Sequence, residues 1–152
     1  MRLLALILIA VCFVGCVQRQ PQSVRDAVGS LKKVQAASEI GTTYEQFSGL
    51  VIDARVKTNN ALKDLPEGEL RDTLSEAIGC YSDAATVWLM KVRRQPLYLY
   101  GDARSILMKY SIQVEQGNVE ASADHDAALT EILKRGNAQV RLAINLVEPS
   151  QK

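Results

Sequence analysis

The sequence has few of the residues that metal, haem or redox chemistry requires. It contains one histidine, His125, and three cysteines, of which Cys12 and Cys16 lie within the first sixteen residues. A zinc or di-iron site needs several histidines, cysteines or carboxylates that converge, and the residues next to His125 point in different directions on a helix. We therefore expect no metal site and no cofactor, and we interpret His125 as part of a solvated helix face.

Catalytic motifs and an excess of charge of one sign are missing as well. The chain has no Gly-x-Ser-x-Gly sequence, no phosphate-binding glycine loop and no cysteine with a positioned histidine. Eighteen lysines and arginines against seventeen acidic residues leave a net charge of +1, which does not favour a nucleic acid backbone. We expect neither an enzyme nor a nucleic-acid-binding protein.

The length and composition suit one folded domain. The chain has 152 residues, 47% of them hydrophobic and only four of them proline, and that hydrophobic content is above the range of disordered chains. A second domain of ordinary size does not fit in this length.

The N-terminus has the order of an export signal. Met1-Arg2 is followed by a twelve-residue apolar run, Leu3 to Val14, then by Gly15-Cys16 and a polar stretch. As a helix the run is about 18 Å long, while a bilayer core of about 30 Å needs about 20 residues. A cleaved signal is therefore favoured over a permanent transmembrane helix, and an ordinary secretory signal or a short anchor helix are the alternatives.

The tetrapeptide Phe13-Val14-Gly15-Cys16 resembles the lipobox of bacterial lipoproteins, with Phe13 in place of the usual leucine. The resemblance implies that residues 1–15 form a signal peptide, that Cys16 is acylated, and that residues 16–22 carry the acyl group and act as a tether. Val17 stands where an aspartate would signal retention in the inner membrane. The resemblance thus implies the outer membrane, facing the periplasm, in a host with two membranes.

The remaining sequence predicts an all-α fold, an antiparallel bundle of four to five helices within residues 23–148. Apolar residues recur at steps of three and four, which is typical of amphipathic helices. The predicted helices cover residues 23–40, 43–65, 69–94, 102–116 and 119–147. Residues 97–100 fit either an extended link or a buried helical start, and we interpret them as a connector.

Local signals set these boundaries. Ser23 is the expected N-cap of the first helix, and Thr42 or Thr43 that of the second. Pro66 and Gly68 predict a tight turn, and Gly117-Asn118 the end of the fourth helix.

Three features of the predicted helices bear on packing. Cys80 lies beside an apolar stripe, which favours burial over a redox or cross-linking role. Gly136 lies among apolar positions, where it allows a close helix contact or a kink. Lys91, Arg93 and Arg94 are interpreted as favourable charges at the C-terminal end of the third helix.

The aromatic residues leave two functional interpretations open. Trp88 and Tyr110 either pack in the core or face a groove for an apolar ligand or a partner helix. The string from Gly41 to Val92 also loosely resembles small helical envelope lipoproteins without an assigned activity, and this implies no functional residue. The leading hypothesis is a lipid-anchored interaction or scaffolding module of the cell envelope, with the membrane and an envelope protein as partners. The alternative is a bundle that binds a lipid or another apolar molecule.

Overall fold

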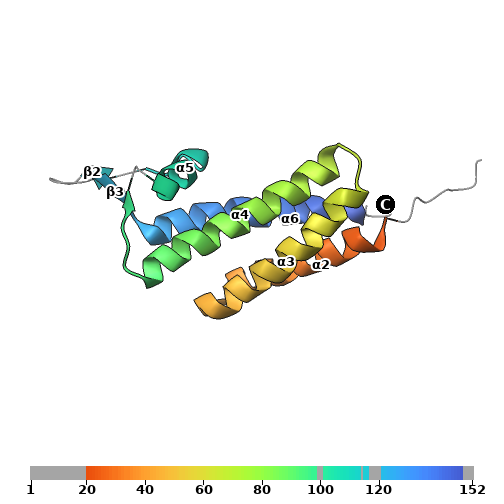
Figure 1. Ribbon diagram of the computed structural model, residues 1–152, viewed down its shortest axis with the longest axis horizontal. Coiled ribbons are helices and arrows are strands. Elements are labelled where there is room, and N and C mark those ends of the chain that lie inside the picture. The colour runs from red at the N-terminus through yellow and green to blue at the C-terminus, as the bar shows by residue number, and fades with distance from the viewer. Residues whose placement is uncertain (1–19, 99–100, 114, 117–120, 149–152) are drawn as a thin grey trace, which may run out of the picture.

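Four long helices form the body of the protein in the computed structural model, which describes residues 20–98, 101–113, 115–116 and 121–148 (Figure 1). The helices are α2 (Gln22–Ile40), α3 (Tyr44–Asp64), α4 (Glu69–Val92), α5 (Gly101–Lys109) and α6 (His125–Val147). The strands are β1 (Leu97–Tyr98), β2 (Glu115–Gln116) and β3 (Ala121–Ala123). The predicted all-α bundle is confirmed.

The long helices follow the order α2, α3, α4, α6 around one core. The two most extensive contacts are between α4 and α6 and between α2 and α3. Smaller contacts join α3 to α4 and α2 to α6. The short turns at residues 41–43 and 65–68 reverse the chain, so that neighbouring helices are antiparallel (Figure 1). We call the end of the bundle that carries Gln20, Pro21 and the turn at 65–68 the turn end.

The core lies along the stripes that the heptad-like spacing predicts. On α3 the buried positions are Phe47, Val51, Ala54, Thr58 and Ala61. The largest fully buried side chains of the other long helices include Leu31, Leu74, Tyr81, Ile132 and Val140. Burial of such side chains stabilises the bundle by about 1.5–3 kcal/mol each.

The two predicted N-caps have different outcomes. Thr43 caps α3: its Oγ1 accepts from the Gln46 backbone N–H at 3.3 Å, and the Gln46 side chain completes a capping box. The prediction for Ser23 is wrong. Helix α2 begins one residue earlier, behind Pro21, whose φ of −51° already suits a helix start. Ser23 instead donates a hydrogen bond to Asp64 Oδ2 at 2.6 Å and joins α2 to α3.

The segment between α4 and α6, residues 93–124, differs most from the sequence prediction. We call it the insert. The fourth helix ends at Lys109, not at residue 116, and Ser111 adopts a positive φ of 54° just beyond that end. Strand β3 pairs antiparallel with both β1 and β2, which gives the order β1-β3-β2.

The last helix begins later than predicted because Asp124 caps it. The Asp124 side chain accepts from the Ala127 N–H at 2.8 Å, so α6 starts at His125 and not at residue 119. Within the connector predicted at 97–100, Leu97 is fully buried and belongs to β1. None of the helices within the described residues is both long and apolar enough to cross a membrane.

Thr58 is a buried polar residue on the core stripe of α3. Its Oγ1 has no hydrogen-bond partner among the described residues. An unsatisfied buried hydroxyl costs about 1–3 kcal/mol, and valine has nearly the same shape as threonine. We expect Thr58→Val to raise the free energy of unfolding by about 1 kcal/mol in urea denaturation followed by circular dichroism.

Thr86→Val is the matched control for this substitution. The Thr86 side chain is exposed, and its hydroxyl donates to the Ser82 carbonyl at 3.1 Å. We expect a change within about 0.5 kcal/mol. A loss of stability in Thr58→Val would mean that the buried hydroxyl has a partner.

Candidate functional site

Trp88, the first of the two predicted ligand-facing aromatics, is half-buried near the C-terminal end of α4. Its ring lies 5.2 Å from that of Phe47 and 6.4 Å from that of Tyr44, measured between ring centroids. Both neighbours belong to the first turn of α3, so packing fixes the orientation of the indole. The remaining face of Trp88 lines a cleft.

The cleft lies between the C-terminal ends of α2 and α4 and the first turns of α6. It has a volume of about 240 Å³. Its lining residues are Ala37, Ser38, Gly41, Thr42, Trp88, Lys91, Asp126, Leu129, Thr130 and Leu133. The volume is below the range of about 300–1,000 Å³ for drug-sized ligands, so the cleft suits a single ring or a short alkyl segment.

The polar groups of the cleft are already engaged within the protein. The hydroxyls of Ser38, Thr42 and Thr130 each donate to an oxygen three or four residues away, at 2.7 Å. Lys91 forms an ion pair with Asp126, which joins α4 to α6. Few donors are therefore left for a ligand, and the cleft offers mainly apolar contact.

Tyr110, the second predicted aromatic, lies in a different environment. Its buried hydroxyl donates to Asp83 Oδ2 at 2.8 Å, and Lys109 Nζ contacts the same oxygen at 2.7 Å. These contacts fasten the end of α5 to the middle of α4. The ring is flanked by Lys109 Nζ at 5.0 Å and the Arg135 guanidinium at 5.8 Å. Within the described structure Trp88 and Tyr110 lie on different faces of α4, and they do not line one groove.

Cys80 lies next to Tyr110 and is fully buried, as predicted. Burial raises the pKa of the Cys80 thiol, and this outweighs the opposing effects of Tyr110 and Lys109. The thiol is therefore protonated at neutral pH and shielded from reagents, which makes it a packing residue.

His125 differs from its sequence interpretation. It is the first residue of α6, half-buried, and its Nε2 lies 2.8 Å from the Gln95 carbonyl oxygen. It thus joins α6 to the insert, and its side chain is only partly solvated. No group of three or more histidine, cysteine or carboxylate side chains able to hold a metal occurs among the residues that the structure describes.

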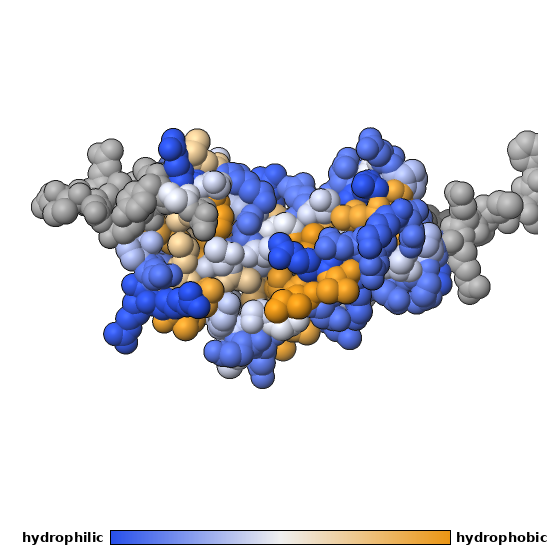
Figure 2. All heavy atoms as spheres, in the orientation of Figure 1, coloured by the Kyte–Doolittle hydropathy of each residue, from blue (hydrophilic) through white to orange (hydrophobic). Residues whose placement is uncertain are grey.

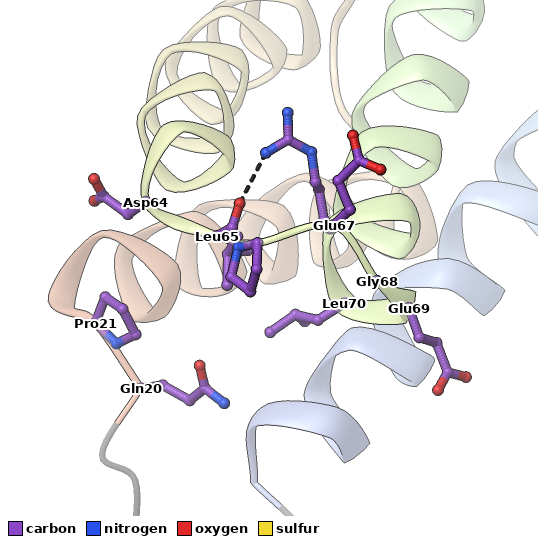
Figure 3. A pocket seen from close by; sticks show the side chains of 10 residues that line it. Gln20, Pro21, Asp64, Leu65, Glu67, Gly68, Glu69 and Leu70 are labelled. Carbon is purple, nitrogen blue, oxygen red and sulfur yellow. Dashed lines mark hydrogen bonds between the residues drawn. The ribbon is translucent and has the colours of Figure 1, made fainter.

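A larger hollow of about 470 Å³ lies at the turn end, between Gln20-Pro21 and residues 64–71 (Figure 3). Arg71 Nη1 donates to the backbone carbonyls of Leu62 and Leu65, at 2.5 and 2.8 Å, and so closes the C-terminal end of α3. The second of these hydrogen bonds is dashed in Figure 3. Arg71 therefore stabilises the turn and is not presented to a ligand.

The acidic side chains around this hollow do not converge. In Figure 3, Asp64, Glu67 and Glu69 point away from one another, while Pro21 and Leu70 lie nearer the middle. A cation site needs several oxygens directed at one point. The hollow has no such arrangement of carboxylates.

An exposed apolar face on α3 was not anticipated from the sequence. Ile52 and Val56 are 65% and 57% exposed, one helical turn apart on the side away from the core. Figure 2 shows an apolar patch over α3 near the centre of the visible face. The sequence signal was present as an i, i+4 apolar pair outside the core stripe. Six of the exposed α3 positions form one stripe that contains this pair, and we call this stripe the α3 face: Glu45, Gly49, Ile52, Val56, Asn59 and Lys63.

Cys16, the predicted lipidation site, lies outside the described residues, as does the signal peptide predicted at 1–15. The candidate sites that the structure does describe are the cleft beside Trp88 and the α3 face. No protein-family model matches the chain, and no significant match to a curated protein or to a solved structure is found.

Proposed function

We propose that this protein is a lipid-anchored interaction or scaffolding module of the cell envelope. The observation that carries the interaction role is the exposed α3 face. Ile52 and Val56 add nothing to the core of the bundle, and exposed apolar residues in one patch are typical of contact surfaces. The lipobox-like sequence at residues 13–16 carries the anchor.

The place where the chain enters the bundle supports an anchor at Cys16. Gln20 and Pro21 lie at the turn end, and Arg25 Nη1 holds the Gln20 carbonyl at 2.6 Å. The four steps from Cys16 to Gln20 extend to about 13 Å at most. An acylated Cys16 therefore keeps the bundle next to the membrane surface.

The anchor is tested by replacing Cys16 with alanine. We expect Cys16→Ala to abolish incorporation of labelled fatty acid and to leave an uncleaved precursor, because the other two cysteines, Cys12 and Cys80, do not stand at the last position of the lipobox-like sequence. Two or three acyl chains anchor a protein stably, whereas one binds a membrane only marginally. Without an acylated Cys16, the variant has no acyl chain to anchor it. Cys12→Ala is the control, with labelling unchanged.

Two outcomes separate the parts of the anchor proposal. Labelling that persists in Cys16→Ala contradicts acylation at this residue. Acylated wild-type protein that fractionates with the inner membrane contradicts only the sorting to the outer membrane, which rests on Val17.

The cleft beside Trp88 favours a second candidate function, the binding of an apolar molecule. Trp88 is the only tryptophan of the chain and lines the cleft, so its fluorescence reports on occupancy. If the cleft binds lipid, dodecanol and short-chain phospholipid shift the Trp88 emission in a saturable way. Leu133→Phe places a larger side chain in the cleft without adding a second tryptophan, and it weakens the response by at least about tenfold. If neither ligand changes the Trp88 emission, binding of an apolar molecule in the cleft is excluded. The small volume and the engaged hydroxyls make it secondary to the interaction role.

A further inference from the structure

We infer that the α3 face binds a second copy of this chain, with the two α3 helices antiparallel about a two-fold axis beside residue 54. The inference deepens the proposed interaction role, on which it rests, by naming the partner. It is independent of the acyl anchor.

The spacing of the α3 face is that of a helix-pairing seam. Its six positions follow one another at steps of four, three, four, three and four residues, and every one is exposed. An a/d repeat of this kind keeps one stripe directed at a neighbouring helix over the whole length of α3. The core stripe of α3 is separate from it, so the helix has two seams and the bundle occupies only one.

An antiparallel pair brings complementary residues together. With the axis beside residue 54, position i faces position 108 − i of the second copy. Ile52 then meets Val56 of the second copy, and Gly49 meets Asn59, where the absence of a side chain leaves room for the amide. At both ends of the seam Glu45 faces Lys63 of the second copy. A two-fold contact uses each of these pairs twice.

The charged groups at the two ends of the seam are available to the second copy. Glu45 and Lys63 take part in no ion pair found among the described residues. Asp53 and Arg55 flank the seam on opposite sides, and Asp53 contacts Lys57 of its own helix at 2.7 Å.

Other arrangements of the same two helices are less favourable. Parallel pairing in register sets Glu45 against Glu45 and Lys63 against Lys63. Moving the antiparallel axis to residue 56 places Glu45 opposite residue 67, beyond the end of α3, and moving it to residue 52 sets Glu45 against Asn59. Of these arrangements, only the axis beside residue 54 combines the apolar contact with the Glu45–Lys63 pair.

The pairing also fixes where the two anchors lie. Helix α3 runs along the bundle, so antiparallel α3 helices place the two turn ends at opposite ends of the dimer (Figure 1). Two copies anchored in one membrane therefore lie with their long axes along its surface, and each needs only its own short tether.

A zero-length carbodiimide cross-link between Glu45 and Lys63 tests this arrangement directly. The two residues are eighteen positions apart on one helix, about 27 Å, so a link between them must join two copies. The full-length protein is treated in isolated membranes, and the linked peptides are identified by mass spectrometry. We expect a dimer band that contains the Glu45–Lys63 link.

Variants of the exposed face test whether this surface holds the dimer. We expect Ile52→Asp and Glu45→Lys each to lower the dimer yield by about tenfold, and the double variant Glu45→Lys/Lys63→Glu to restore it, because both charges of each pair are then reversed. In these variants the dimer band is formed with a bis-lysine reagent, which does not require the Glu45–Lys63 link. The control is Met108→Asp on α5, where the side chain is 64% exposed and no change is expected. Circular dichroism checks that each variant folds.

The outcomes distinguish this inference from the proposed function. A dimer that Ile52→Asp does not weaken, or one without the Glu45–Lys63 link, overturns the inference. If the wild type forms no dimer but cross-links to another envelope protein, and Ile52→Asp removes that product, the inference fails and the interaction role stands. If nothing is cross-linked, both fail.

Discussion

Replacing Phe47 with alanine is expected to lower the free energy of unfolding by about 3–5 kcal/mol, because the side chain is fully buried where α3 meets α4. Its ring lies 6.4 Å from that of Tyr81, edge to face, and 5.2 Å from that of Trp88. The substitution removes both contacts and leaves a cavity between helices that cannot fully collapse. Such a loss is a large part of the total stability of a small domain.

The measurement is urea unfolding followed by circular dichroism, since Trp88 fluorescence is itself changed by the loss of its neighbour. Ile40→Ala is the matched control: Ile40 ends α2, is 83% exposed, and its truncation is expected to change stability by less than about 0.5 kcal/mol. A loss below about 1 kcal/mol for Phe47→Ala would show that these three rings are not a packed cluster.

The long helices were predictable because their signal extends over many residues. On α3 the apolar steps of three and four continue for five turns, and Thr43 with Gln46 supplies a start signal. Each turn repeats the same information, so the error at the ends of α2, α3 and α4 is one or two residues, as at Pro21. Among the long helices, only the start of α6 differs by more, because Asp124 caps that helix.

The insert was not predictable for the opposite reason. Strands of two or three residues have no period to detect, and their pairing joins residues far apart, such as Leu97 with Ala123. Helix α5 ends where Ser111 takes a positive φ, which nothing in the local sequence requires. Here tertiary contact outweighs the local helical pattern of residues 102–116.

The candidate sites divide in the same way, between residues with a local sequence signal and residues whose role depends on distant contacts. The sequence drew attention to Trp88, and the structure places it at a cleft, but the partners of Tyr110 come from α4 and α6 and have no sequence signature. Lys91 was interpreted as a charge for the helix dipole, and its main contact is Asp126 on another helix. The α3 face has a weak sequence signal, because Ile52 and Val56 are its only large apolar residues while the core stripe of the same helix is far more apolar.

Gly136 determines how closely α4 and α6 approach each other, as its place among apolar positions suggested. A Cβ at this residue would lie 3.1 Å from Cys80 Cβ and 3.2 Å from Tyr81 Cε1. Tyr81 cannot move aside easily, because its ring is fully buried and its hydroxyl donates to Asn137 Oδ1 at 2.7 Å. The most extensive helix contact of the bundle therefore depends on the missing side chain.

We accordingly expect Gly136→Leu to lower the free energy of unfolding by about 3 kcal/mol, the upper end of the usual cost of overpacking, because α6 must move away from α4. The helix propensity gained on replacing glycine, about 1 kcal/mol at most, offsets only part of this. Gly29→Ala on α2 measures the gain in helix propensity alone, because a Cβ at Gly29 would have no neighbouring atom within 4 Å. This variant should raise the free energy of unfolding by up to about 1 kcal/mol. Both variants are compared with wild type by urea unfolding. If Gly136→Leu is as stable as wild type, α4 and α6 do not approach as closely as the packing of Cys80 and Tyr81 against Gly136 requires.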